Sequence, residues 1–547
     1  MLRWALCVLV FASCIERKSK KAESEPTNVS LSRPKPASLP ASLPASLPVS
    51  PVAVRSQEPS GSLSEAASIV VRLASEPRHL NPLLAGDTIA VQVALGDVYE
   101  SLLQRARPGA RPTPHLATRN SQSTDGLSWV FELREGVKFH DGTTLSVADV
   151  AASFALVQNV VGPLRGEFDD LESVTITGPR TIAFRFSESR PERADAFASV
   201  PIVSAKSFQG ADVTTLNLHT ASQSPNGTGP LQLQRTSVDE IALVRNQSYW
   251  GPPAKARRIV YRVIADRTRA LNELRSGQLD VVLGLPVDEA VAAVKGDASL
   301  ELIQRSLPAY TAAVFNTENT KLHREARSAL SRSFDRESIL QELFRGYAEV
   351  AIGPFLRHGN REAPAGVESE FVLKSAVADL RAAFSDATPK LQLLVPRGSR
   401  TMERLADIWA NDVRGAVDID VQQVEFGALL ARVRSGDFEM ALLSFTTSAD
   451  TDLFSLFHSS EVGRGNLSRL AEPAVDALLE TLRRSLAEEE RIETSHALQH
   501  QLLRFAPYAF LTTDVRLGIV RKDVAGVGDT APAEGARFYG RLAKAPP

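Results

Sequence analysis

Hydrophobic positions between residues 391 and 445 change period several times along the chain. Short apolar or alternating runs predict three strands, at Leu391–Val395, Val417–Val421 and Met440–Phe445. Two stretches of helical period lie between them, and the first has an apolar face formed by Leu405, Ile408, Trp409 and Val413. This β-α-β-α-β order predicts an α/β fold with a parallel or mixed sheet and helices packed on it.

The loop after the third predicted strand is a candidate binding site. Ligands of such sheets bind beyond the carboxyl ends of the strands. The loop directly after Phe445 is polar and contains Thr446, Thr447, Ser448 and Asp450. We expect it to contact a ligand, and the alternative is a solvated turn that never touches one.

Other segments predict a body of strands joined by short turns and helices. We expect one helix to begin at Ser146, where Asp149 completes a capping box, and another to end at Gly277. Strands are predicted at Ser68–Leu73, Trp129–Leu133, Val137–His140 and Ile259–Ile264, with two more between Val174 and Phe186.

The N-terminus reads as an export signal. Arg3 precedes a short apolar stretch, and Ala12 and Ser13 come directly before Cys14. This segment resembles the bacterial lipobox, so residues 1–14 are predicted to be a lipoprotein signal peptide with lipidation at Cys14. Ordinary secretion, with an incidental Cys14, is the alternative. The only other cysteine is Cys7, so the body has neither disulfides nor a thiol nucleophile.

Residues 15–66 are predicted to be a disordered tether. An Ala-Ser-Leu-Pro repeat occupies residues 36–51, and proline at every fourth position blocks helices and sheet ladders. The folded body is expected at 67–547. We expect a periplasmic, membrane-anchored protein, and the sequence leaves open whether the inner or the outer membrane holds the anchor.

Composition and motifs argue against several functions. The formal net charge is −2, which gives no basic footprint for nucleic acid. Nucleophile elbows, phosphate loops and His-Glu-x-x-His are absent from the sequence, so we expect no catalytic residues, no cofactor and no metal. His496 and His500 could in principle ligate a metal, but a solvated helical face is preferred. His140–Asp141 is interpreted as turn-stabilising rather than catalytic.

Several ordered segments resemble the family 5 extracellular solute-binding proteins, the receptors of peptide importers. The strongest block is Phe131–Gly142, followed by Ala148–Val150. The others are Leu80–Pro82, Val98–Leu103, Gly227–Pro230, Arg245–Asn246, Tyr249–Gly251, Ser276–Val281, Phe315–Asn316, Ala329–Leu330, Phe334–Glu337 and Gly436–Phe438.

The resemblance implies a periplasmic-binding-protein-like α/β fold with two main lobes, each with a mixed β-sheet, plus a third, inserted lobe and a hinge between lobes I and III. Lobe I would contain about 67–94, 196–305 and 508–547, lobe II about 95–195, and lobe III about 306–507. A ligand would be enclosed between lobes I and III by hinge closure.

The resemblance also implies partners. These are a peptide-like or other small polar solute and the ABC permease subunits of the inner membrane, with a monomeric receptor. The alternatives are an envelope signalling or chaperone-like protein on the same fold without a transport role, and a periplasmic hydrolase.

The sequence departs from the family pattern at the expected ligand site. Peptide-binding members carry a Gly-Trp pair, which falls on Ser444–Phe445, and an amine-binding Asp, which falls on Ser448; Asp450 could replace it only if the loop is re-routed. Phe445 keeps an aromatic ring there. Opposite it, Asp87 to Ile89 match a segment that lines the ligand. We therefore hypothesise a ligand that depends less on a cationic amine, an idea that amine-dependent binding of ordinary peptides would refute.

Overall fold

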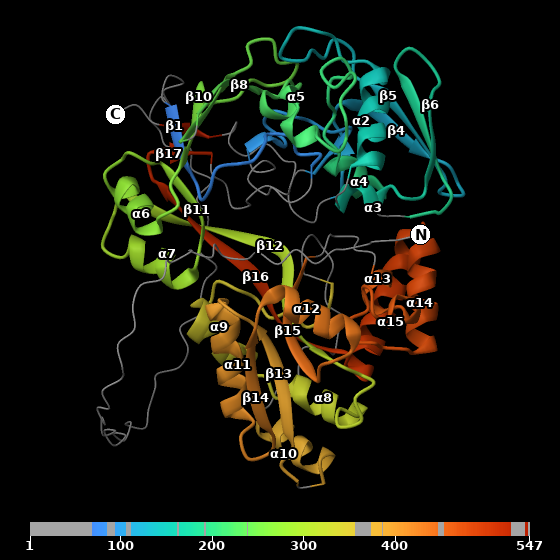
Figure 1. The fold of residues 1–547 in the computed structure, drawn as a ribbon, viewed down its shortest axis with the longest axis vertical. Helices are drawn as coiled ribbons and strands as arrows, with labels where there is room; N and C mark the ends of the chain where they lie inside the picture. Colours follow the sequence, from blue (N-terminus) through green and yellow to red (C-terminus); the bar gives the residue numbers. More distant parts are fainter. Residues whose placement is uncertain are drawn as a thin grey trace.

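The computed structural model describes residues 68–84, 93–105, 111–160, 163–190, 193–237, 239–355, 373–385, 387–446, 453–526 and 542–544. They form a ten-stranded mixed sheet, a separate four-stranded sheet, and the helices that cover both (Figure 1). The predicted signal peptide with Cys14 and the predicted tether at 15–66 lie outside the described residues.

The ten-stranded sheet runs through the whole molecule (Figure 1). We call β1 and β8 to β11 its upper half, and β13 to β15 its lower half. In spatial order the strands are β14 (Asp418–Val424), β13 (Lys390–Pro396), β15 (Met440–Thr446), β12 (Leu300–Phe315), β16 (Tyr508–Arg521), β11 (Val281–Leu285), β1 (Ser68–Leu73), β10 (Arg258–Val263), β9 (Glu240–Arg245) and β8 (Leu231–Thr236).

The two long strands β12 and β16 join the halves. They pair antiparallel from Leu300 opposite Arg521 to Val314 opposite Tyr508, with register shifts between Ser306 and Tyr310 and between Thr311 and Ala312. Figure 1 shows both strands passing from the upper half into the lower half. Two long strands with an irregular pairing therefore connect the two halves of the sheet.

The lower half confirms the predicted β-α-β-α-β unit. Helices α11 (Arg400–Asp412) and α12 (Phe426–Ser435) alternate with the strands, and β13 is parallel to both β14 and β15. Because β15 is antiparallel to β12, the sheet is mixed. Trp409 on the predicted apolar face is fully buried, and its Nε1 donates to Ser333 Oγ at 2.9 Å.

Helices cover both faces of the lower half. Alternate residues of β12 explain this, because Ala313 belongs to one apolar core and Val314 to the other. The first core is built with α8 (Arg324–Arg332), α9 (Arg336–Phe344), α10 (Leu373–Ala383) and α11, and it reaches α6 (Arg267–Arg275) and α7 (Val287–Val294) of the upper half. The second is built with α12, α13 (Phe454–Phe457), α14 (Pro473–Arg484) and α15 (Glu488–Phe505).

The four-stranded sheet forms a small module beside the upper half (Figure 1). Its strands are β4 (Ala117–Gln122), β5 (Ser128–Leu133), β7 (Thr181–Phe186) and β6 (Leu171–Ile176), and its helices are α2 (Val147–Asn159), α3 (Pro163–Glu167) and α4 (Arg193–Ser199). Phe131, Phe154 and Phe184 surround Phe197 with ring centroids 4.6–5.5 Å away. Edge-to-face aromatic packing of this kind stabilises the module beyond simple burial.

Short elements complete the described chain. They are β2 (Leu103–Gln104), β3 (Thr113–Pro114), η1 (Leu216–Leu218), α5 (Thr220–Gln223), η2 (Ser459–Glu461), β17 (Val524–Ala525) and β18 (Ala543–Lys544). No helix in the described ranges is both long enough and apolar enough to cross a bilayer.

One predicted strand is wrong. Residues 137–139 lie between turns at 135–136 and 140–141, and only Lys138 among them forms a bridge, to Thr144. Val137 and Phe139 are buried, which produced the alternating pattern, but Gly136 and Gly142 adopt φ of +75° and +85° and fold the segment back on itself. The capping box at Ser146 is confirmed, since Asp149 Oδ2 accepts from the Ser146 backbone N–H at 2.9 Å. The strands at Ser68–Leu73, Trp129–Leu133, 174–186 and Ile259–Ile264 are confirmed within a few residues, as is the helix that ends at Gly277.

Candidate ligand-binding site

The carboxyl end of β15 is the first place to look for a ligand, because it points toward the junction of the two halves. Thr446 pairs through its backbone with Ala309 of β12 and ends the strand. The predicted contacts Thr447, Ser448 and Asp450 follow it but lie outside the described residues, as do Asp87 and Ile89. Their contact with a ligand stays a prediction.

Phe445 lies inside an aromatic stack. Its ring is fully buried between Tyr310 at 5.4 Å and Tyr508 at 5.0 Å, with interplanar angles of 23° and 28°. Neither tyrosine hydroxyl has a hydrogen-bond partner among the described residues, and burial raises the pKa of both phenols. Phe445 is therefore part of the second core in this structure, and its contact with a ligand also stays a prediction.

The opposite face of the same strands carries a hydroxyl-carboxylate cluster that sequence reasoning missed. Thr311 Oγ1 of β12 donates to Asp514 Oδ1 of β16 at 2.9 Å and lies 2.8 Å from Ser444 Oγ of β15. Burial raises the pKa of Asp514, more strongly than the nearby Thr311 and Ser444 hydroxyls and the charge of Arg516 lower it. No described residue forms an ion pair with this carboxylate.

A second buried carboxylate, Glu100, lies in the upper part of the molecule. It is 2% exposed, and the side chains of Tyr249, His115, Thr228 and Trp250 are among those that contact its two oxygens. Tyr249 Oη and His115 Nε2 lie 2.8 and 2.7 Å from Oε1. Thr228 Oγ1 and Trp250 Nε1 donate to Oε2 at 2.9 and 3.0 Å. We call these five residues the Glu100 node.

The glycines of the Gly227–Pro230 segment allow its backbone to pack directly against the chain before Glu100. The Gly229 N–H donates to Val98 O at 2.9 Å, and a Cβ on Gly229 would lie only 2.3 Å from Asp97 O. A Cβ on Gly227 would lie 2.0 Å from Val98 O. His140 supports the same turn, with Nε2 at 3.0 Å from Gly229 O and Nδ1 accepting from Gly227 N–H. The structural interpretation of His140 is confirmed.

Two more of the segments that resemble the family form hydrogen bonds to distant parts of the chain. Asn316 Nδ2 donates to Gly436 O and Phe438 O, each at 3.0 Å. The buried Arg336 donates from Nε to Phe510 O at 2.8 Å, and burial lowers its pKa to about 9. These side chains satisfy backbone carbonyls between distant segments, so they determine the fold and not the ligand.

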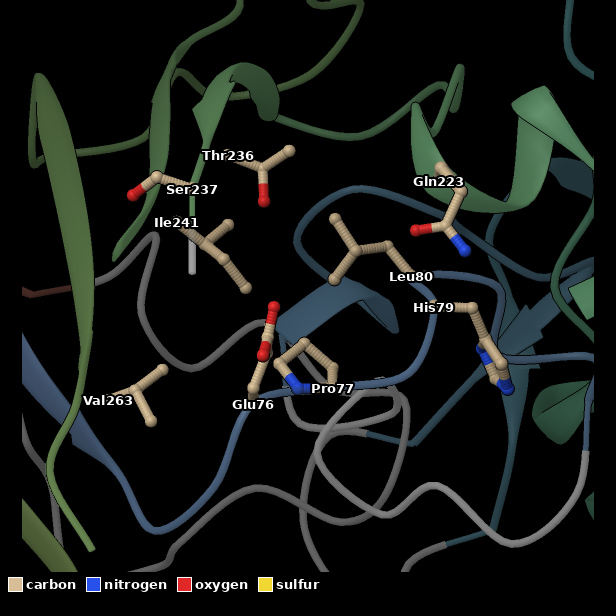
Figure 2. A pocket seen from close by; sticks show the side chains of 9 residues that line it. All are labelled: Glu76, Pro77, His79, Leu80, Gln223, Thr236, Ser237, Ile241 and Val263. Carbon is tan, nitrogen blue, oxygen red and sulfur yellow. The ribbon is translucent and has the colours of Figure 1, made fainter. Parts of the chain in front are cut away.

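Two of the pockets in the described structure can be compared with the size of a ligand. The first, shown in Figure 2, measures ≈ 50 Å³, and Glu76, Leu80 and Ile241 are among the residues that line it. It could hold a water or two but not a peptide, since ligand pockets measure roughly 300–1,000 Å³. The second, ≈ 580 Å³, is open and lies between α9 and Val350, which bridges to Thr512 of β16.

No group of three potential metal ligands occurs among the described residues. His496 and His500 lie on α15, with His500 exposed to solvent. The arrangement offers hydrogen bonds, an unpaired carboxylate and a junction between two half-sheets, which suits binding.

Two half-sheets with helices on their faces, joined by two long strands, define a solute-binding protein of the periplasmic-binding-protein-like class. The family model for bacterial extracellular solute-binding proteins, family 5, matches residues 111–465. The chain belongs to this family, whose members bind solutes outside the cytoplasm.

Named relatives agree with this assignment. A probable di/tripeptide-binding protein of Pseudomonas aeruginosa is 26% identical over 76% of this chain and 84% of its own length. The dipeptide-binding protein of Escherichia coli is 23% identical, and the match covers 84% of this chain and 92% of that protein. Protein XP55 of Streptomyces lividans is 27% identical, and the match covers 83% of this chain and 84% of that protein. The first two relatives are named as binding proteins, and the name of XP55 states no activity.

Solved structures show the same fold. HbpA2 from Haemophilus parasuis superposes with a TM-score of 0.78 at 22% identity, covering 87% of this chain and 100% of its own. DppA from Helicobacter pylori, bound to the peptide STSA, gives 0.70 at 21% identity, with 88% and 98% covered.

Proposed function

We propose that this protein captures a peptide-like solute between the two halves of its large sheet and delivers it to the permease of an ABC importer. One observation carries the proposal: the two halves continue into each other through β12 and β16, whose pairing shifts register near Tyr310. Irregular strands at such a junction can absorb the rotation of a hinge while the helices on either side stay rigid.

The lobe boundaries form part of the proposal. Lobe I would contain about 67–94, 196–305 and 508–547, and lobe III about 306–507. Lobe II, about 95–195, would include most of the small module. The distribution of the strands supports these limits, since β1 and β8 to β11 fall in lobe I and β13 to β15 in lobe III.

The ligand class and the anchor are proposed on different grounds. Relatives named for di- and tripeptides support a peptide-like solute. The sequence before Cys14 supports a lipid anchor that would hold the protein at the membrane facing the periplasm. A monomer is proposed, since one chain contains both halves of the site.

Purified residues 67–547 provide the test. Native mass spectra would be recorded before and after exposure to a peptide-rich cell extract and to the same extract depleted of peptides. We expect stoichiometric adducts with peptide masses from the first extract only. Ligand at a hundredfold its Kd should also raise the free energy of unfolding by about 2.7 kcal/mol.

A protein that stays empty with both extracts would contradict the proposal and favour the signalling or chaperone-like alternative. Adducts that disappear while shorter peptides accumulate would instead revive the hydrolase alternative. Either result would leave the family membership intact, because the family and the fold rest on other observations.

A further inference from the structure

The expected site lacks the carboxylate that the family pattern places there, because Ser448 occupies that position. The structure brings another carboxylate to the same strand. Asp514 comes from β16, and the Thr311 hydroxyl links it to the Ser444 hydroxyl, two residues before the end of β15. The two strands are separated by β12, so Thr311 lies between them and connects the two side chains.

The position of Asp514 suits a binding role. It lies where β12 and β16 pass between the halves, close to the register shift at Tyr310. Its side chain is partly buried and keeps some accessible surface. A ligand held between the halves can therefore reach it, and closure would remove the remaining water.

The charge of Asp514 is not balanced within its cluster. Thr311 and Ser444 supply hydroxyl hydrogen bonds but no positive charge, and Arg516 acts only from its own strand without forming an ion pair. Among the described residues, this partly buried carboxylate has therefore lost hydration without gaining a counter-ion. An arriving ammonium group would restore the balance, and its hydrogen bonds to a carboxylate would be charge-assisted and short.

We propose that Asp514 binds a cationic group of the solute, such as the free amine of a peptide, and that Thr311 and Ser444 are the hydroxyls that position it. This inference rests on the proposed function and narrows it to cationic solutes. It replaces the expectation, drawn from the loss of an Asp at residue 448, that the ligand depends little on an amine.

The test uses residues 67–547 and a defined probe. The probe is an equimolar mixture of di- to pentapeptides made from Ala, Ser, Leu and Phe, used with free amines and after N-acetylation. Binding is measured by native mass spectrometry and by the ligand-induced rise in Tm. The variants are Asp514→Asn, Asp514→Glu and, as a control with the same change of charge at an exposed site, Asp407→Asn.

We expect the wild type and Asp407→Asn to bind free-amine peptides at least tenfold more tightly than acetylated ones. Asp514→Asn should lose this preference, and Asp514→Glu should keep part of it. Asp514→Asn is nearly isosteric, so its Tm without peptide checks that it folds, and this Tm should equal or exceed that of the wild type.

Two failures can be told apart. Peptides bound with equal affinity in free and acetylated form, or bound equally well by Asp514→Asn, would overturn the role of Asp514 and leave the proposed function standing. No binding of either mixture by the wild type would overturn the proposed peptide ligand and the role of Asp514 together.

Discussion

Glu100 and Asp514 are both carboxylates withdrawn from solvent, but their surroundings differ. Glu100 is contacted by four side chains that come from three separate segments of the upper part. Asp514 accepts a hydrogen bond from the Thr311 hydroxyl, which is itself hydrogen-bonded to Ser444, and has no ion pair among the described residues. A satisfied carboxylate holds a fold together, whereas an unbalanced one near a hinge is available to a ligand. We therefore assign Glu100 a structural role and keep the proposed ligand-binding role for Asp514.

The largest effect is expected at the Glu100 node. In Glu100→Gln, one of the two acceptor oxygens becomes an NH2 group, so the side chains that donate to that oxygen lose their acceptor whichever way the amide turns. The charge-assisted hydrogen bonds are lost, and polar groups stay buried without partners. The free energy of unfolding, measured by urea denaturation, should fall by roughly 3 kcal/mol. A loss below about 1 kcal/mol would show that the node is not structural.

A smaller effect is expected where the backbone approaches the node. In Gly229→Ala the new Cβ would meet Asp97 O at 2.3 Å, and backbone atoms cannot move aside as a flexible side chain can. The loss should be about 1–3 kcal/mol by the same measurement. Gly427→Ala is the matched control, because a Cβ there meets nothing within 4 Å and α12 gains a better helix former. It should be neutral or stabilising by up to about 1 kcal/mol.

The smallest effect is expected at Asp514, with the opposite sign. Since its pKa is raised in the folded protein, ionisation costs the folded state more than the unfolded one. The stability of the wild type relative to Asp514→Asn should therefore fall as the pH rises above the ordinary pKa of aspartate, and level off above the raised pKa. Its neighbours on β12 and β15, Thr311 and Ser444, do not titrate, and the charge that acts on it comes from Arg516 on its own strand.

Thermal unfolding of both proteins between pH 3 and pH 8, without peptide, measures this difference. Added free-amine peptide should reverse it, because an ammonium group favours the ionised carboxylate. A wild type that gains stability over Asp514→Asn with rising pH, without peptide, would mean that Asp514 is already neutralised within the protein. The contrast with Glu100 would then disappear.

Sequence reasoning succeeded where a local pattern decides the structure. The β13 to β15 unit was predicted because buried strands and one-sided helices differ in period. The same reasoning failed at residues 137–140, because glycine-containing turns can bury Val137 and Phe139 in alternation without a strand.

The candidate site was predicted only in part. The end of β15 follows from strand order, but the predicted residues beyond Thr446 lie outside the described structure. Asp514 was out of reach, because it meets Ser444 only through the intervening strand β12, whose register shifts near Tyr310. The motif segments were found as a family resemblance, and the Glu100 node supplies the physical reason for three of them, Val98–Leu103, Gly227–Pro230 and Tyr249–Gly251.

A measurement of the distance between the two halves, with and without bound peptide, tests the proposed capture by closure most directly. The body has no cysteine, so Leu218→Cys above and Ile492→Cys below, both at exposed positions, can carry a pair of fluorophores. Their distance, measured by energy transfer, should shorten when the free-amine peptide mixture is added and should not change when Asp514→Asn is also present. A distance that stays the same while mass spectrometry shows peptide bound to the wild type would contradict capture by closure.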